Sequence, residues 1–141
     1  MSLNRYYSIP DKALVKQVPQ PMQHLVNAEM AKGLRGEIVY YTMEDPFTLG
    51  TQEVLISKVK EKPRVEGFIF FTLNQFSYSG SLHYRLMEWI LGQGYELHFA
   101  RERLSMKNSE ELRTAFPLLF TQAYVGIRDK AHKFIQEILQ P

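Results

Sequence analysis

Polar residues follow each of the apolar segments that have the composition of β-strands, and these residues could do chemistry. They are Ser8, Glu44, Asp45, Asn74, Gln75, Arg101, Glu102 and Arg103. Ser8 is a candidate nucleophile, although its activating base would have to come from the fold. The alternative for Ser8 is a serine in a loop or helix cap. Glu44 and Asp45 are candidates for a general base or a metal pair, or they form a solvated turn before Pro46.

The amides and arginines of this set have the chemistry of ligand binding. Asn74 and Gln75 can donate hydrogen bonds to a polar ligand such as a sugar and accept them from it. They can equally cap a helix that starts a few residues later. Arg101 and Arg103 flank Glu102, and the three residues can bind phosphate or carboxylate. An exposed ion-pair cluster is the alternative for this segment.

Metal and thiol chemistry have little support in the sequence. The chain has no cysteine, which excludes disulfides, thiolate zinc sites and cysteine nucleophiles. Its histidines have no metal-ligand spacing; they are His24, His83, His98 and His132. We therefore expect no metal and no cofactor. His98 alternates with Leu97 and Phe99 in a strand candidate, and we interpret it as a histidine with satisfied partners under a covering helix.

Four strand candidates alternate with helical patterns, and they must position these residues. The strands are predicted at 3–9, 36–43, 65–73 and 95–100, and the helices at 20–33, 51–62 and 81–94. Such alternation predicts parallel strands joined by right-handed crossovers. The segment 65–73 is almost continuously apolar, as expected for a central strand covered on both faces. The prediction is a three-layer α/β domain with a mostly parallel four-stranded sheet, whose strand ends bring the polar residues to one rim.

The last third of the chain is predicted to be helical and to belong to the same domain. Asn108 and Glu111 have the spacing of a capping box. Apolar residues then recur with helical period, and Pro117 must break or kink the pattern, which gives helices at about 109–116 and 118–139. We therefore divide the chain into a sheet region, 1–107, and a helical extension, 108–141. The apolar stripe is longer than one small sheet needs, so we expect a homodimer through these C-terminal helices.

Composition excludes several classes of protein. The chain of 141 residues is 45% hydrophobic and 23% charged, which is typical of one globular domain. Lys plus Arg number 17 against 15 Asp plus Glu, so the concentrated basic face that binds nucleic acid is not expected. The longest apolar run, FIFF, is far too short for a membrane span. We expect a cytoplasmic protein.

Several motifs have the order and spacing of a known catalytic domain. Ser8 follows the first strand and Gln23 lies in the first helix. MEDPFTLG (43–50), TLNQFSYS (72–79) and GYELHFARERL (94–104) follow. Over about residues 3–115 this pattern resembles the catalytic domain of serine recombinases, the resolvases and invertases. The resemblance implies a resolvase-like fold, related more loosely to flavodoxin-like folds, with a long dimerising helix.

The departures from that pattern argue against recombinase activity. Asn74 stands at the aspartate position of the recombinase motif, and Gln75 and Tyr78 stand at its two arginines. Tyr6 occupies the position of a further arginine, two residues before the serine. An amide or phenol supplies no positive charge to a phosphodiester in its transition state.

A second resemblance comes from shorter segments. They are VPQPMQHLV (18–26), VEGFIFFTLNQF (65–76) and YELHFARERLSMKNSEEL (95–112). They resemble a family of small bacterial proteins found sporadically in surface-carbohydrate gene clusters. This resemblance implies an accessory protein of carbohydrate or polysaccharide metabolism. The amides and arginines at the strand ends further predict that the rim binds a polar metabolite such as a nucleotide sugar. The alternatives are a hydrolase that acts on a phosphorylated sugar through Ser8, and a dimeric interaction module.

Overall fold

The computed structural model describes residues 2–43, 52–78 and 81–115. The main elements are β1 (Asn4–Ile9), α1 (Gln20–Gly33), β2 (Gly36–Tyr41), α2 (Glu53–Lys60), β3 (Gly67–Phe70), α3 (Tyr84–Gly92), β6 (Glu96–Phe99) and β7 (Leu104–Met106). Short elements complete the fold: 3-10 turns at Lys12–Leu14 and Leu73–Phe76, and the strands β4 (Ser77–Tyr78) and β5 (Ser81–Leu82). Residues 109–115 are helical. The predicted strands and helices of the sheet region are all present; α1 has the predicted bounds and the others are shorter.

The sheet has five strands in the order β2-β1-β3-β6-β7. The first four are parallel to their neighbours, as predicted. The fifth, β7, is antiparallel to β6 and pairs His98 with Ser105. The predicted count of four strands is therefore wrong. The sequence hides β7 because it has only three residues and follows the charged segment 101–103, which is typical of a loop.

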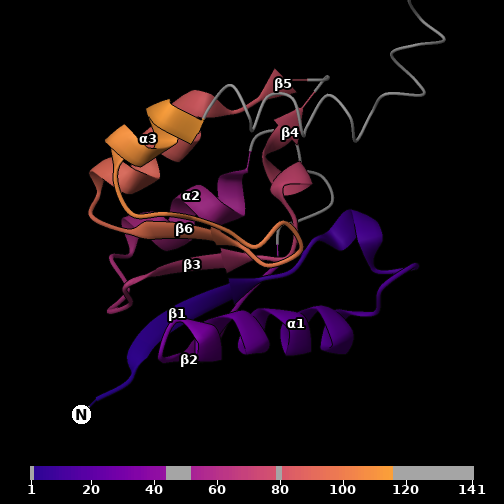
Figure 1. Cartoon of the computed structure of the whole chain (residues 1–141). Coiled ribbons are helices and arrows are strands. Elements are labelled where there is room, and N and C mark those ends of the chain that lie inside the picture. The colour runs from indigo at the N-terminus through magenta and orange to yellow at the C-terminus, as the bar shows by residue number, and fades with distance from the viewer. Residues whose placement is uncertain (1, 44–51, 79–80, 116–141) are drawn as a thin grey trace, which may run out of the picture.

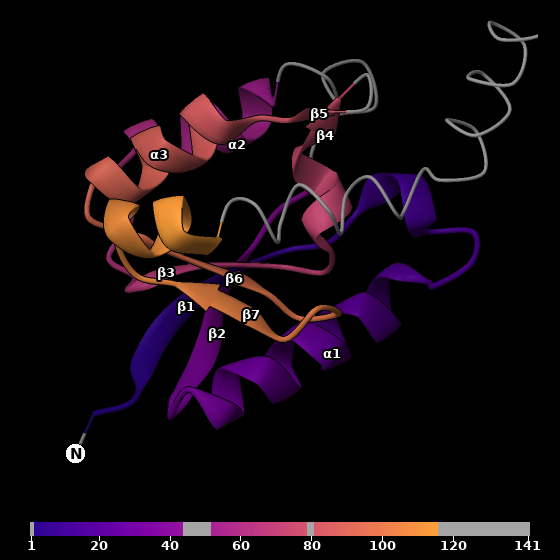
Figure 2. The same cartoon turned by 45° about the horizontal axis from the view of Figure 1, so that its top comes forward.

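Helices cover both faces of the sheet and make three layers (Figure 1). The helix α1 packs on one face, and α2, α3 and residues 109–115 lie on the other. Figure 2 shows the same layers after a rotation. The larger core cluster lies between the sheet and α2 and α3, and it includes the buried rings of Phe68, Phe70, Phe76 and Phe99. Under α1 a small cluster of Tyr6, Ala31, Ile69 and Ala100 is buried. Burial on both faces explains why the central strand β3 is apolar at every position.

The helices begin and end at the proline, glycine and capping residues that the sequence indicates. Pro21 lies in the first turn of α1, where its missing N–H costs no hydrogen bond. The LGQG segment ends α3 at Gly92, and Gly94 has a φ of 93°, which glycine adopts without strain. The Asn108 side chain accepts the N–H of Glu111 at 2.9 Å, so the predicted cap is confirmed. The Glu111 carboxylate receives the backbone N–H of Lys107.

The strand β3 begins at Gly67, where two neighbouring strands come close together. A Cβ atom at this position would collide with the backbone of Glu96.

The predicted helix at 118–139 lies outside the described residues, as do Glu44 and Asp45. Within the described ranges no helix combines the length and apolar character that crossing a membrane requires.

Candidate functional site

The carboxyl ends of β1, β3 and β6 meet at one rim, as the parallel topology requires. Two of the predicted site residues hold this rim together. The Glu102 carboxylate accepts the Thr72 hydroxyl at 2.8 Å and the Leu73 N–H at 2.9 Å. The Gln75 amide donates to the Ile9 carbonyl at 3.0 Å. Its side-chain oxygen accepts the Thr72 N–H at 3.1 Å, so Gln75 and Thr72 form a capping box. Gln75 and Glu102 therefore join the strand ends to one another.

Three predicted site residues remain exposed at this rim. They are Asn74, Arg101 and Arg103. Arg103 lies in the tight turn between β6 and β7 with a φ of 53°. Arg101 lies close enough to the buried Asp11 to act on its carboxyl group. Burial raises the pKa of Asp11, while the Ala13 N–H and the Arg101 charge lower it. Among the described residues no group of three acidic, histidine or cysteine side chains could hold a metal ion.

Ser8 has a base within reach, but it is enclosed. Its hydroxyl lies 2.8 Å from Nδ1 of His24, and the Asn27 amide donates to the same oxygen at 2.9 Å. Asn27 also donates to the Ile69 carbonyl at 3.2 Å. Burial lowers the pKa of His24, which favours the neutral imidazole that a base requires. Ser8 is fully buried, however, and among the described residues no arginine contacts it. The three side chains form a buried hydrogen-bonded cluster that an outside substrate does not reach.

The sequence gives no signal for this cluster, because Ser8 and His24 are far apart in the chain. Gln23, on the same helix, is also buried. Its amide accepts the Asp11 N–H at 2.6 Å, and donates to the Asp11 carbonyl at 3.0 Å and to the Val18 carbonyl at 2.9 Å. The inward face of α1 is therefore polar at Gln23 and Asn27.

Several large apolar residues of α1 lie away from the sheet instead, whereas the small Ala31 is buried. Met22, Leu25 and Val26 are 53%, 62% and 38% exposed. Tyr40 and Tyr41 of the edge strand β2 are 42% and 57% exposed. The His24 ring packs edge-on against Tyr41 with centroids 4.5 Å apart, which connects the helix to the strand.

Tyr40 lies on the other face of the sheet, where its ring packs against Tyr7, and Val26 lines a hollow together with Ala100 and Arg103. We call the exposed Met22, Leu25 and Tyr41, which lie on the α1 side of the sheet, the α1–β2 surface.

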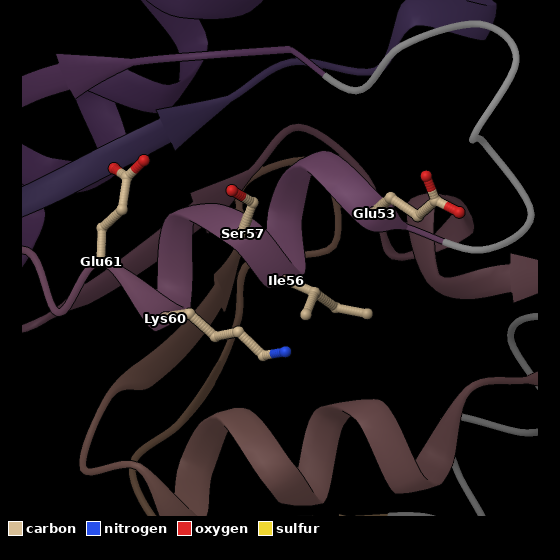
Figure 3. A pocket seen from close by; sticks show the side chains of 5 residues that line it. All are labelled: Glu53, Ile56, Ser57, Lys60 and Glu61. Carbon is tan, nitrogen blue, oxygen red and sulfur yellow. The ribbon is translucent and has the colours of Figure 1, made fainter.

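A hollow along α2 lies away from all of these residues. It has a volume of about 530 Å³ and is lined by Glu53, Ile56, Ser57, Lys60 and Glu61 of the α2 region. In Figure 3, Ile56 and Lys60 extend from α2 toward the neighbouring helix. It contains none of the residues that the sequence predicts to be functional.

Comparison with solved structures finds a similar fold. A resolvase family site-specific recombinase from Streptococcus pneumoniae matches with a TM-score of 0.63 and covers 97% of each chain. The identity is 13%, so the likeness concerns the fold alone. No family model and no curated protein matches the sequence. The chain therefore has a resolvase-like α/β fold, as the first sequence resemblance implies.

The structure shows how two of the departures from the recombinase pattern are used. Tyr6, at an expected arginine, is 2% exposed, and its hydroxyl donates to Glu96 at 3.5 Å. Burial, followed by the charges of Glu96 and Glu66, raises the pKa of Tyr6 to about 12. Gln75, at another expected arginine, bonds to the backbone. Both positions serve internal packing and provide no cation for a phosphodiester.

Proposed function

We propose that this chain is a cytoplasmic accessory protein that works as a homodimer through the α1–β2 surface. The exposure of Met22 and Leu25 on α1 carries this proposal. A surface helix normally turns its apolar stripe toward the core, whereas α1 turns polar residues inward and apolar residues outward. Contiguous apolar side chains on a surface mark sites of interaction with another protein.

A second copy of the chain fits this surface because β2 is the edge of the sheet. The strand β2 pairs only with β1 among the described strands. An open strand edge can pair with another strand. Two copies related by a two-fold axis would pair their β2 edges and cover each other's Tyr41 and α1 residues in one isologous contact. A stable dimer buries about 800 Å² per partner, and a surface that spans a helix and a strand can approach that area.

The carbohydrate gene cluster remains our proposed context, on the strength of the sequence resemblance. A polar ligand such as a nucleotide sugar would meet the exposed Asn74, Arg101 and Arg103. The amide of Gln75 and the carboxylate of Glu102 already have internal partners, which weakens ligand binding as the main function. Hydrolysis through Ser8 has less support still, because its hydroxyl is enclosed.

Light scattering coupled to size-exclusion chromatography tests the dimer. Wild type is expected to have the mass of two chains. Leu25→Glu places a charge in the centre of the surface and should give a monomer with unchanged circular dichroism. Lys32→Ala, an exposed substitution elsewhere on the same helix, is the matched control and should remain dimeric.

Two results would contradict this assignment. One is a wild type that stays monomeric at the highest concentration that can be reached. The other is a Leu25→Glu variant that remains a dimer while Phe134→Glu is a monomer. In that case the contact would belong to the C-terminal helices that the sequence indicates.

A further inference from the structure

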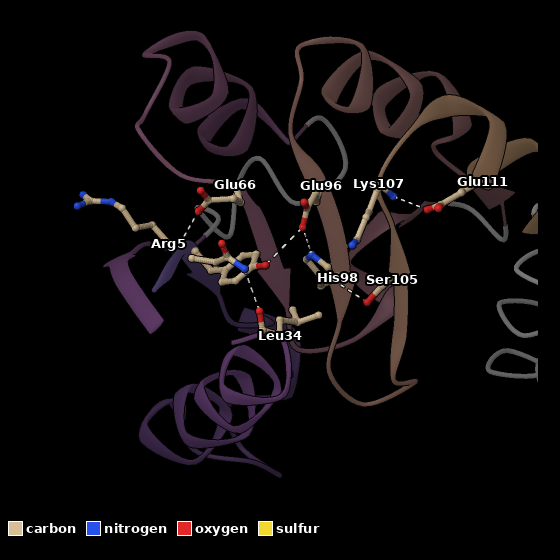
Figure 4. Close-up of polar contacts among 10 residues, drawn as sticks. Arg5, Leu34, Glu66, Glu96, His98, Ser105, Lys107 and Glu111 are labelled. Atoms are coloured by element: carbon tan, nitrogen blue, oxygen red, sulfur yellow. Dashed lines mark hydrogen bonds and ion pairs between the residues drawn. The ribbon is translucent and has the colours of Figure 1, made fainter. Parts of the chain in front are cut away.

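At the edge of the sheet opposite β2, three polar side chains form a hydrogen-bonded row. Nε2 of His98 lies 2.8 Å from a Glu96 carboxylate oxygen, and Nδ1 of the same ring lies 2.7 Å from the Ser105 hydroxyl. Figure 4 shows the three side chains side by side, with Lys107 next to them. We call this set the Glu96–His98–Ser105 row.

The sheet itself aligns the row. Glu96 and His98 are two residues apart on β6, so their side chains emerge on the same face. Ser105 lies directly opposite His98 in the antiparallel pair of β6 and β7. The ring of Tyr6 packs edge-on against His98 at 5.3 Å and limits its movement. Side chains on a paired sheet hold their relative positions better than side chains on loops.

The hydrogen bonds assign the protons of the row. A carboxylate can only accept, so the Nε2 proton of His98 points at Glu96. Nδ1 then carries a lone pair and accepts the proton of the Ser105 hydroxyl. This polarity, acid to histidine to serine hydroxyl, is the one that activates a nucleophilic serine. Burial lowers the pKa of His98 and outweighs the opposing effect of Glu96, so the imidazole is in its basic, neutral form at neutral pH.

The members of the row differ in exposure as such chemistry requires. His98 is fully buried, whereas Ser105 is exposed and can meet a substrate. Ser8 has the opposite arrangement, with a buried hydroxyl.

Positive charge lies near the row, and a hollow lies at the neighbouring β6–β7 turn. Lys107 follows directly after β7, and its charge is close enough to contribute to lowering the pKa of His98. The hollow has a volume of about 420 Å³ and lies between α1 and the β6–β7 turn; Met30, Leu34 and Ala100 line it together with the charged Glu29 and Arg103, among others. These features suit a substrate with a short apolar part and an anionic group.

We propose that Ser105, His98 and Glu96 form a nucleophilic serine site that hydrolyses small esters carrying a negative charge. The Ser105 oxygen bonds to the ester carbonyl carbon while its proton passes to Nδ1 of His98. The bond from the carbonyl carbon to the alkoxy oxygen breaks, and the leaving alcohol takes that proton. Water then attacks the acyl-serine by the same proton route and releases the carboxylic acid. The Glu96 carboxylate accepts the hydrogen bond from Nε2 and stabilises the imidazolium, and Lys107 attracts the anionic group of the substrate.

The test uses the full-length chain with 4-nitrophenyl acetate and its anionic analogue 4-nitrophenyl hemisuccinate. Wild type should release nitrophenolate above the buffer rate and prefer the hemisuccinate. Ser105→Ala should fall to the buffer rate. His98→Gln should lose about 100-fold or more, the usual contribution of a general base. Lys107→Ala should lose the preference for the anionic ester by several-fold while retaining turnover of the acetate.

Controls separate this site from other serines and from folding. Ser57→Ala removes an exposed serine of α2 and should react like wild type. Circular dichroism shows whether each variant is folded. If His98→Gln does not fold, Ser105→Ala still tests the proposal, because it changes an exposed residue. Leu25→Glu should retain the reaction, because the row is independent of the α1–β2 surface. Wild-type release at the buffer rate, equal rates in wild type and Ser105→Ala, or an acyl group mapped by mass spectrometry to another residue would each overturn the proposal.

Discussion

At the scale of single residues, the fully buried His98 and the half-buried His24 are each bonded to a serine, in different surroundings. His24 bonds to the enclosed Ser8, and His98 bonds to Glu96 and the exposed Ser105. Burial is the first cause that lowers the pKa of each ring. Because the two hydroxyls differ in access to solvent, only Ser105 is in a position to react with a substrate from outside.

The same two histidines make stability depend on pH. In the unfolded chain a histidine titrates near 6.5, and both folded pKa values lie below that. The unfolded state therefore binds more protons as the pH falls through that value. The free energy of unfolding should be highest above about pH 7 and should decrease toward about pH 5.5.

Urea denaturation at several pH values measures this effect. The His98→Gln variant should show a smaller decrease than wild type, because one of the two depressed histidines is gone. Glu96, Lys107 and Glu111 are the charged groups that act on His98, and Glu96 and Glu111 oppose the depression. A stability that rises on acidification over this range would contradict the assignment of a neutral, buried His98.

At the scale of elements, α1 has the opposite amphipathicity from an ordinary surface helix. Its buried positions include Gln23 and Asn27, and its exposed positions include Met22 and Leu25. These polar side chains can be buried because they form hydrogen bonds inside the protein in place of those to water. Gln23 bonds to backbone carbonyls, and Asn27 bonds to Ser8 and to a backbone carbonyl. One atom, Oδ1 of Asn27, has no partner in the described structure.

The neighbouring residues Met22 and Gln23 give a direct test of this orientation. Gln23→Ala removes three hydrogen bonds and leaves buried backbone groups unpaired, so it should cost at least about 2 kcal/mol of unfolding free energy. Met22→Ala should change it by about 0.5 kcal/mol or less, because the side chain is half exposed. Urea denaturation compares the two variants at low protein concentration, where the proposed dimer would add little to the free energy of unfolding. A larger loss for Met22→Ala would mean that α1 is rotated from the orientation described.

At the scale of the whole molecule, a resolvase-like fold lacks arginine at positions where the recombinase resemblance expects it. The net charge is only +2, and Tyr6 and Gln75 occupy positions where the recombinase resemblance expects arginine. The two edges of the sheet have different features, since β2 presents apolar residues and β7 presents Ser105, with Lys107 directly after it. We therefore assign assembly to one edge and chemistry to the other.

Binding to a DNA duplex should accordingly be weak. Nonspecific binding depends on several Lys or Arg contacts to phosphates. Because the near-balance of basic and acidic residues predicts no concentrated basic face, we expect a dissociation constant weaker than about 100 µM at physiological salt. Fluorescence anisotropy of a labelled duplex measures it, with a basic DNA-binding protein as the positive control. Saturation at low micromolar protein would show that a basic surface is formed on assembly.

The sequence predicts regular elements well where the signal is local and long. The apolar run around Ile69 and the LGQG terminator are such signals, and both appear as expected. The sequence does not predict β7, because three residues after a charged turn carry too little pattern to identify a strand. It also leaves the roles of Gln75 and Glu102 open, because their partners come from other strands.

Alternating apolar and helical segments determined, without coordinates, that this is a parallel α/β sheet with polar strand ends. Periodicity acts between near neighbours in the chain, so it is written in the sequence. Only the tertiary structure decided that α1 turns its apolar residues outward, that Ser8 is enclosed and that Ser105 stands exposed beside a buried histidine. Those outcomes depend on which distant side chains satisfy each other's hydrogen bonds, and hydrogen bonds between residues such as Ser8 and Asn27 leave no regular spacing to read.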